Sequence, residues 1–309
     1  MVKILGNEIY EFICGRLSSD EKNDFEVALE AYYLKKHHLK RLAHVSERIL
    51  PYIKPNDRIL DLGSDGIFPY IAKNFIEDIE AHAVSKSSYD IIFTEDGHAC
   101  TRENCGIESE NISQENIVRL QKCDLDKERL PFEDNSIDVV TCFEVLEHLY
   151  TDPMHLMLEA KRVLKKPDGL FFLSTPNINS LKALKRMLNM ESPYFWPPYC
   201  ITDLEIGHVK EYSVNELKLL FEKSGFSILD METFNHGEDD LFSHDRLYQA
   251  GNVLGTRKSI EQAQLDERLY CFLDSINWDS RYQGDYAFIM SKWKTDTSDR
   301  YYFPLYESY

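Results

Sequence analysis

The sequence predicts an α/β fold in which a mostly parallel sheet is covered by helices on both faces. Short apolar runs alternate with helix-forming segments along most of the chain. The clearest example is residues 136–177, where residues 137–143 are apolar, Asp152 and Pro153 open a helix, and residues 167–169 turn into a second apolar run. Ligands of such folds bind at the carboxyl ends of the strands, so residues that follow strands are the candidates for function.

Composition limits the classes of protein to which the chain can belong. Its 309 residues are 43% hydrophobic and 12% aromatic, which excludes general disorder. No apolar run approaches the roughly 20 residues of a membrane span, and the first 17 residues do not read as a secretory signal, so we expect a cytoplasmic protein. The net charge of −18 opposes binding to nucleic-acid backbones and favours a small or neutral partner.

The seven cysteines are scattered, and several lie in apolar runs where a reduced thiol behaves as a small hydrophobic side chain. We therefore expect no disulfides. His98, Cys100 and Cys105 form one group that zinc could bind, but the second cysteine pair of a typical zinc motif is missing. Reduced, unliganded thiols are the favoured interpretation.

Two helices are predicted before the first strand. Residues 1–35 form a helical extension with a capping box at Ser18 and Glu21, and we expect this extension to serve as a lid or as the surface of a homodimer. Residues 36–53 form the second helix, which residues 54–57 end. Its apolar side chains share one face: Leu39, Leu42, Ile49 and Ile53.

Residues 58–66 predict a strand that runs into a glycine-containing turn, and residues 67–75 a helix after it. Glycines in such a turn let the backbone approach a ligand closely, while the helix N-terminus faces an anionic group such as a carboxylate. An ordinary βα turn has the same pattern, and the dinucleotide-binding fingerprint GxGxxG is absent. Both interpretations stay open from this segment alone.

The next strands are predicted at residues 79–84 and 117–123, and the second of these ends at Asp124. Between them, residues 87–116 are polar and acidic. We interpret this segment as an insertion on the edge of the sheet where ligands bind.

Residues 178–212 are predicted to cover a substrate. They contain a basic helix, residues 181–190, and an aromatic, proline-rich loop, residues 192–200. Three cations of the helix could bind a phosphate or a nucleotide-linked sugar, although a solvated helix face is more common: Lys182, Lys185 and Arg186.

Ser213 and Glu216 form a second capping box, and it opens a helix that Gly225 closes. Residues 226–234 are then predicted to form a strand. The order of helix and strand again matches an α/β unit.

The C-terminal part predicts a helix at residues 259–276 and a final strand at residues 286–293, which we expect to be antiparallel and at the edge of the sheet. Residues 295–309 form a tail rich in tyrosine. Such an aromatic segment is expected to pack back on the domain.

The candidate functional residues follow the strand at residues 137–143. Glu144, Glu147 and His148 stand at positions i, i+3 and i+4, so a helical turn would bring them to one face. His208 belongs to the segment that is expected to fold over the same end of the sheet. These residues supply two carboxylates and two imidazoles.

Four phrases in this order resemble class I S-adenosylmethionine-dependent methyltransferases: RILDLGSDG, CDLDKERLPFEDNSIDVVTCFEVLEHL, RVLKKPDGLFFLSTPN and GHVKEYSVNELKLLFEKSGF. The resemblance covers residues 36–294 and is strongest to ubiquinone-pathway O-methyltransferases and to methyltransferases among bacterial glycan-assembly enzymes. It implies a Rossmann-like sheet of seven strands, mostly parallel with an antiparallel last strand, and S-adenosylmethionine as methyl donor.

The resemblance also implies which residues bind the methyl donor. Asp61 and Gly63 would belong to the loop around its methionine part, together with Ser64 and Gly66 of the same turn. Asp124 and Leu125 would contact the adenine ring, and Phe143 would lie at the edge of the cofactor.

The chain departs from the family pattern at two places in this region. Asp65 and Ile67 stand where glycines are common. Ser85 stands where an acidic residue usually binds the ribose hydroxyls, and Glu95 or Asp96 could replace that acid.

The residues Glu144, Glu147, His148 and His208 resemble the metal site of ubiquinone-pathway O-methyltransferases and of small-RNA 3′-terminal 2′-O-methyltransferases. Mixed oxygen and nitrogen ligands suit Mg, Mn or Zn. Many methyltransferases with this pattern have no known metal, and there the histidine is a general base or part of the structure. We favour the interpretation without a metal.

The predicted function is O-methylation of a small-molecule or glycan-type hydroxyl. His148 would act as base or metal ligand, and His208 would lie near the acceptor. A catalytically silent binding or regulatory protein on the same fold is the alternative from another class, since the glycine loop is altered and the ribose acid is missing. N-methylation of an amino-sugar also stays open, as does RNA 3′-terminal 2′-O-methylation, which conflicts with the acidic charge.

Overall fold

The computed structural model describes residues 6–17, 38–63, 66–85, 89–93, 99–101, 117–194, 207–235, 268–269 and 271–294. The helices are α1 (Gly6–Leu17), α3 (His38–Ile49), α4 (Ile67–Phe75), α5 (Pro153–Val163), α6 (Leu181–Leu188) and α7 (Val214–Ser224), with short 3₁₀ turns η2 (Leu50–Tyr52), η5 (Leu146–His148) and η7 (Ser280–Tyr282). The strands are β1 (Arg58–Leu62), β2 (Glu80–Ser85), β3 (Tyr89–Phe93), β4 (Ala99–Thr101), β5 (Ile117–Lys122), β6 (Val139–Phe143), β7 (Leu170–Pro176), β8 (Phe226–Phe234) and β9 (Tyr286–Trp293).

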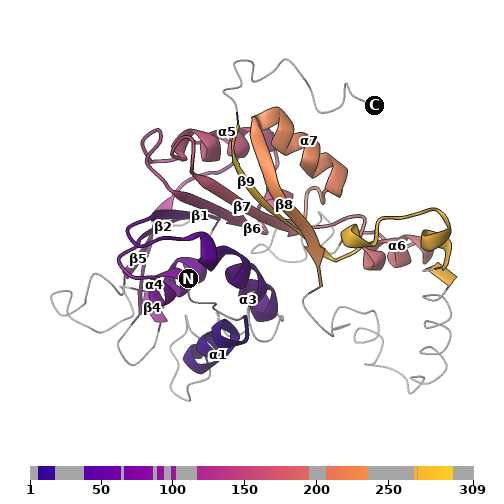
Figure 1. Cartoon of the computed structure of the whole chain (residues 1–309), viewed down its shortest axis with the longest axis horizontal. Coiled ribbons are helices and arrows are strands. Elements are labelled where there is room, and N and C mark those ends of the chain that lie inside the picture. The colour runs from indigo at the N-terminus through magenta and orange to yellow at the C-terminus, as the bar shows by residue number, and fades with distance from the viewer. Residues whose placement is uncertain are drawn as a thin grey trace.

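The strands within the described residues form one sheet in the order β4-β3-β5-β2-β1-β6-β7-β9-β8 (Figure 1). β5, β2, β1, β6 and β7 run parallel to their neighbours in this series, and β9 is antiparallel to both β7 and β8. The mostly parallel α/β sheet with an antiparallel last strand is therefore confirmed.

Two details of the sheet differ from the prediction. The last strand, β9, lies between β7 and β8 and not at the edge, because β8 pairs with its outer side. The segment 87–116, predicted as a polar insertion, contributes β3 and β4, and β3 pairs antiparallel with β5. These two strands extend the expected seven strands to nine among the described residues. Residues 89–93 are an apolar run, YDIIF, but this run is short and lies within a segment that is polar and acidic as a whole.

One face of the sheet is covered by α1, α3 and α4 (Figure 1). The apolar face predicted for residues 36–53 is buried, with Leu39, Leu42 and Ile49 each at most 6% exposed. Ile9 and Ile13 of α1 belong to the same core cluster, so the described part of the N-terminal extension joins the core of the domain.

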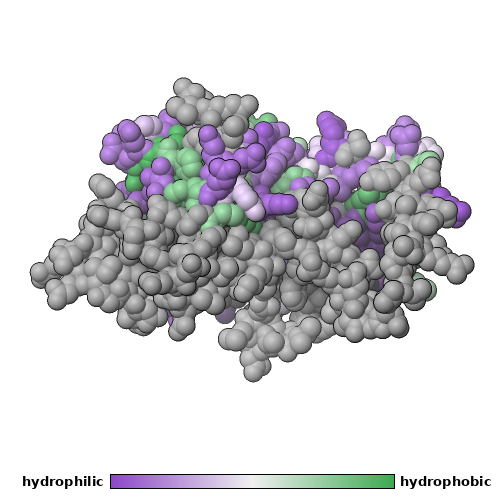
Figure 2. Space-filling model, turned by 90° about the horizontal axis from the view of Figure 1, so that it is seen from below, coloured by the Kyte–Doolittle hydropathy of each residue, from purple (hydrophilic) through white to green (hydrophobic). Residues whose placement is uncertain are grey.

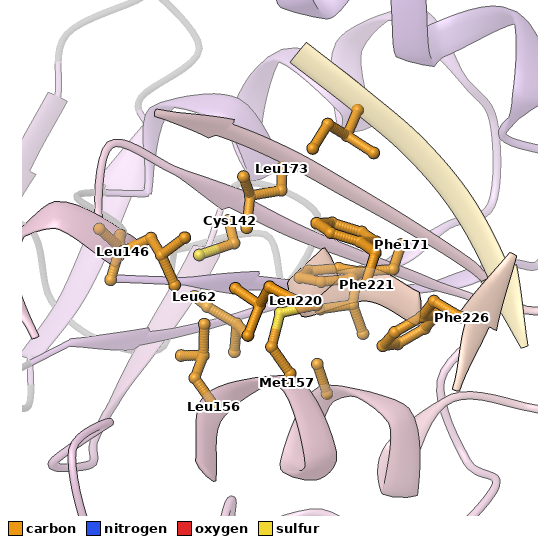
Figure 3. Packing of buried hydrophobic residues seen from close by; sticks show 14 of the residues in the cluster. Leu62, Cys142, Leu146, Leu156, Met157, Phe171, Leu173, Leu220, Phe221 and Phe226 are labelled. Carbon is orange, nitrogen blue, oxygen red and sulfur yellow. The ribbon is translucent and has the colours of Figure 1, made fainter. Parts of the chain in front are cut away.

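The other face is covered by α5 and α7 (Figure 1). Phe171 of β7 stacks on Phe221 of α7 with ring centroids 5.8 Å apart, and Phe226 packs beside both rings. Figure 3 shows these rings together with Leu156 and Met157 of α5 beneath the sheet. Burial of this apolar area is the main contribution to the stability of the fold.

The helix starts agree with the sequence signals. The Asp152 side chain accepts a hydrogen bond from the backbone N–H of Met154 at the start of α5. At the start of α7, Ser213 and Glu216 make both hydrogen bonds of the capping box, and Gly225 ends the helix with φ of 82°. These caps fix where each helix leaves the sheet.

No helix among the described residues is long and apolar enough to cross a membrane. Four cysteines of the described part are free thiols: Cys14, Cys123, Cys142 and Cys271. On the face shown in Figure 2, hydrophobic side chains of the described part are bordered by hydrophilic ones.

Several predicted features lie outside the described residues. They are the capping box at Ser18 and Glu21, the group of His98 and Cys105, the candidate acids Glu95 and Asp96, most of the helix at 259–276 and the tail at 295–309. The central part of the predicted substrate cover, residues 195–206, is also outside them. These features, and the domain limits drawn from them, stay predictions.

Candidate functional site

The predicted cofactor residues lie at or just after the carboxyl ends of four neighbouring strands. Asp61 belongs to β1, Ser85 ends β2, Asp124 follows β5 and Phe143 ends β6, and these strands are adjacent in the order β5-β2-β1-β6. Because the four strands are parallel, their carboxyl ends meet at one edge of the sheet. The topology therefore gathers residues that are far apart in the sequence.

Asp61 is buried at 4% exposure, and its carboxylate accepts a hydrogen bond of 2.6 Å from the hydroxyl of Thr141. The two residues are directly opposite each other in β1 and β6. Thr141 thus holds one carboxylate oxygen of Asp61 at the ligand end of the sheet.

Glycine is required in the turn after β1. Gly63 has φ of 70°, and a Cβ at this position would overlap the Val145 side chain. Gly66 has φ of 86° and precedes the first turn of α4. The N-terminus of α4 therefore points its backbone N–H groups toward the turn, which suits a carboxylate ligand. Ser64 lies outside the described residues.

The other cofactor candidates have partners in the protein. Phe143 is half-buried and meets Phe68 edge-to-face with centroids 5.2 Å apart. Asp124 is partly exposed and pairs with Lys127 at 3.2 Å, while Leu125 packs against the core. Ser85 accepts a backbone hydrogen bond from Cys123.

Glu147, His148 and His208 lie together beyond the ends of β6 and β7. One ligand atom from each residue can be chosen so that all three atoms lie within 4.8 Å of one another. The imidazole rings of His148 and His208 are 4.9 Å apart and nearly perpendicular, at 82°. Glu147 and His148 belong to the 3₁₀ turn η5, and His208 comes from the segment before α7.

The segment of His208 is fixed to η5 by backbone hydrogen bonds. The carbonyl oxygen of Glu147 accepts hydrogen bonds from the N–H groups of Val209, at 2.7 Å, and Lys210, at 3.2 Å. The sequence prediction that His208 folds over the same end of the sheet agrees with this geometry.

The Glu147 side chain is fully buried. Its Oε2 accepts a hydrogen bond of 3.0 Å from the hydroxyl of Thr175. Its Oε1 has no hydrogen-bond donor among the described residues and lies 4.0 Å from Nε2 of His208. One oxygen of a buried carboxylate is thus directed at the imidazoles.

Glu144 is not a member of this group. It has φ of 56° and precedes the 3₁₀ turn, so it does not share the helical face that its spacing predicted. Its carboxylate forms a buried ion pair with Arg41 of α3 at 2.9 Å and accepts a hydrogen bond of 2.8 Å from Ser174.

His208 is oriented by a second carboxylate. Its Nδ1 lies 2.6 Å from Oε1 of Glu211, and both side chains are buried. A carboxylate can only accept, so Nδ1 carries the hydrogen of this bond, and Nε2 is the ring nitrogen on the side of Glu147.

Burial controls the electrostatics of Glu147 and of Glu144, which precedes it in the chain. Burial raises the pKa of Glu147 well above its ordinary value, and the charge of Glu144 raises it further. Burial also raises the pKa of Glu144, while Arg41 and the Ser174 hydrogen bond oppose that rise. A positive charge beside Glu147 would stabilise its ionised form.

Four contributors to the site were not identified from the sequence: Arg41, Thr141, Thr175 and Glu211. Glu211 stands three residues after His208 in a polar segment, which is a signal that could have been used. Arg41 gave no such signal, because only the packing of α3 on the sheet brings it to Glu144.

Comparison with known proteins gives a consistent family. Residues 34–230 match the family model described as "Methyltransferase domain". A probable S-adenosylmethionine-dependent methyltransferase of Mycolicibacterium smegmatis is 30% identical over 152 residues, which are 48% of this chain and 52% of that protein. The ubiquinone biosynthesis O-methyltransferase of Haemophilus ducreyi is 54% identical over 46 residues, which are 15% of this chain and 18% of that protein.

The chain thus matches about half the length of the first of these relatives and less of the second. Among solved structures, the complex of the Haloferax volcanii Trm112 methyltransferase activator with a methyltransferase contains a chain of the same fold. The TM-score is 0.50 at 14% identity, with 86% of this chain and 96% of that chain covered.

Proposed function

Because the chain belongs to the methyltransferase domain family, we propose that it transfers the methyl group of S-adenosylmethionine to a hydroxyl group of a small-molecule or glycan-type acceptor. The observation that carries the proposal is the pair of imidazoles, His148 and His208, 4.9 Å apart at the ligand end of the sheet. Hydroxyl acceptors must lose a proton during transfer, and imidazole is the side chain best suited to accept it near neutral pH.

Features of the turn after β1 support binding of the methyl donor. Gly63 and Gly66 adopt left-handed φ values, and the N-terminus of α4 presents backbone N–H groups suited to the donor's carboxylate. Asp61, Ser85, Asp124, Leu125 and Phe143 follow or end the adjacent strands, and we propose that they line the donor's binding site. The donor supplies an activated sulfonium methyl group, and the chain must orient it.

In the reaction, the acceptor oxygen forms a bond to the methyl carbon while the carbon–sulfur bond breaks. We assign the acceptor's proton to His148 as general base, with His208 beside the acceptor. S-adenosylhomocysteine leaves as a neutral thioether and needs no proton. The protein's contribution is therefore orientation of the two reactants and removal of one proton.

A divalent cation fits the same residues. Glu147, His148 and His208 provide one carboxylate oxygen and two imidazole nitrogens within 4.8 Å, and Glu147 Oε1 has no hydrogen-bond donor among the described residues. The proposed cation is Mg, Mn or Zn, held by these three side chains with Glu144 nearby. When bound, such an ion lowers the pKa of a hydroxyl that it coordinates.

The test is transfer of a labelled methyl group to a panel of hydroxyl and amino-sugar acceptors. His148→Ala should lower the rate about 10²- to 10⁴-fold, as expected for loss of a general base. His155→Ala is the matched control, since His155 lies on α5 and bonds the carbonyl of Glu128. Full activity of His148→Ala would remove His148 from the mechanism.

Calorimetry with S-adenosylmethionine separates this function from the main alternative. Binding by the wild type and by His148→Ala is expected, because His148 is not assigned to the donor. A wild-type protein that gives no heat at millimolar ligand would favour a catalytically silent binding protein. Methylation of amino-sugars alone would favour N-methylation.

A further inference from the structure

Glu144, the acidic residue three positions before Glu147, is already paired with a cation of the protein. Glu144 pairs with the Arg41 guanidinium at 2.9 Å, with side-chain exposures of 8% and 9%, and also accepts the Ser174 hydroxyl. A metal ion bound to Glu144 would have to displace or approach this buried positive charge. The ion's place is therefore among the other three side chains.

Those three side chains are rich in nitrogen. Two of the three ligand atoms, from His148 and His208, are imidazole nitrogens, and the third is a carboxylate oxygen of Glu147. Imidazole suits Zn²⁺ and similar transition-metal ions, whereas Mg²⁺ prefers oxygen ligands in a regular octahedron. Two histidines with one glutamate also form the zinc site of several hydrolases, where one position stays open for a reactant.

The surroundings of the three ligands match a zinc site as well. Glu211 accepts the hydrogen of His208 Nδ1 and leaves Nε2 for coordination, which is the usual carboxylate–histidine arrangement behind a metal. Thr175 holds Oε2 of Glu147, so that Oε1 is the oxygen left for an ion. Ligand atoms of a tetrahedral zinc site lie roughly 3.4 Å apart, so binding would draw the three side chains together.

We propose that Glu147, His148 and His208 form a three-ligand site selective for Zn²⁺ or a similar borderline cation over Mg²⁺, with Glu211 as the residue that positions His208. The proposal rests on the proposed function only for what the ion would do during transfer. The selectivity itself is a property of these side chains. It follows from a ligand set of two imidazole nitrogens and one carboxylate oxygen, because Arg41 already pairs with the second carboxylate, Glu144.

The test is titration of the chelator-treated full chain with ZnCl₂ and, separately, with MgCl₂, followed by calorimetry. We expect one Zn²⁺ at this site, bound at least about 100-fold more tightly than Mg²⁺. The double variant His148→Ala/His208→Ala should bind one Zn²⁺ fewer than the wild type, whatever other histidines and cysteines bind. Circular dichroism checks that the variant is folded.

Two single variants examine the roles of the carboxylates. Glu211→Gln should weaken Zn²⁺ binding about 10- to 100-fold, as is typical for loss of a residue behind a metal ligand. Glu222→Gln, which changes an exposed carboxylate on α7, should not. Equal affinity for Mg²⁺ and Zn²⁺, or an unchanged zinc stoichiometry in the double histidine variant, would overturn the proposal.

If the double variant does not fold, His208→Asn alone replaces it, and an unchanged zinc stoichiometry again overturns the proposal. Methyl transfer is measured on the same samples before and after chelation. The metal titration tests the selectivity for Zn²⁺ over Mg²⁺, and the transfer assay tests the proposed methyl transfer. The two can therefore fail separately.

Discussion

Nη1 of Arg41 lies 2.9 Å from Oε2 of Glu144, and this buried ion pair joins α3 to the residue that follows β6. Glu144 also adopts φ of 56°, which is unusual for a residue with a side chain. The pair fixes the carboxylate of Glu144, which precedes the candidate site in the chain. Its energetic role can be measured by removing one charge and then both.

Arg41→Met should destabilise the protein by about 3–5 kcal/mol, because it leaves the Glu144 charge buried without its cationic partner. Arg41→Met/Glu144→Gln should recover most of this loss. The measurement is urea unfolding followed by circular dichroism. Arg48→Met is the control: the side chains of its pairs with Asp230 and Glu232 are 33–42% exposed, so a loss under about 1 kcal/mol is expected. Equal losses in both variants would contradict the assignment.

Thr175→Val should lower methyl transfer about tenfold, since the variant keeps the side-chain shape but removes the hydroxyl that holds Oε2 of Glu147. It should also cost about 1–3 kcal/mol of stability. Ser291→Ala removes a buried hydroxyl in β9 that bonds the carbonyl of Phe171. A similar stability loss with normal transfer is expected for that control, and a parallel fall in transfer would show that Thr175 acts only through stability.

Gly63→Ala should destabilise the protein by about 1–3 kcal/mol, because alanine at φ of 70° is strained and its Cβ would overlap Val145. Adding Val145→Ala relieves the overlap but not the backbone strain, so it should restore only part of the loss. Gly6→Ala, where the Cβ meets the flexible end of the Glu47 side chain, should stay within about 1 kcal/mol of the wild type. Thermal unfolding of the three variants provides the comparison.

Phe171→Ala should cost about 3–5 kcal/mol, since the ring is fully buried between β7 and α7 (Figure 3). Phe272→Ala removes a ring that is 57% exposed and should change the free energy of unfolding by less than about 0.5 kcal/mol. Chemical denaturation measures both. Similar losses would mean that the packing around Phe171 is looser than its burial indicates.

Stability should fall in acid through Glu159. Burial alone would raise the pKa of Glu159, but hydrogen bonds from Arg162 and from the Leu130 N–H lower it overall. A carboxyl whose folded-state pKa is lowered stabilises the protein above its unfolded value of about 4.3, and that contribution is lost as the pH falls through the folded-state pKa. The free energy of unfolding measured from pH 6 to pH 3 should therefore drop more steeply in the wild type than in Glu159→Gln. Equal slopes would exclude this carboxyl as the cause.

Much of the fold was predictable because it depends on local signals. The predicted strands within residues 58–66 and 137–143 became β1 and β6, and the capping box at Ser213 and Glu216 starts α7 as expected. The position of β9 inside the sheet was not predictable, since period-2 patterning says nothing about which strands become neighbours. The apolar run of β3, YDIIF, was a usable signal, whereas the three residues of β4 are too few to show a period.

The sequence by itself predicted that Glu147, His148 and His208 would lie close together, because two of them follow a parallel strand and the third belongs to a segment that returns to the same edge. Only the tertiary structure decided which carboxylates lie beside the imidazole of His208. Helical spacing grouped Glu144 with Glu147, but the packing of α3 pairs Glu144 with Arg41, and the path before α7 aims Glu211 at His208. Spacing along the sequence determines which residues can share a helical turn. The charged partner of each carboxylate depends on contacts between segments that are distant in the sequence.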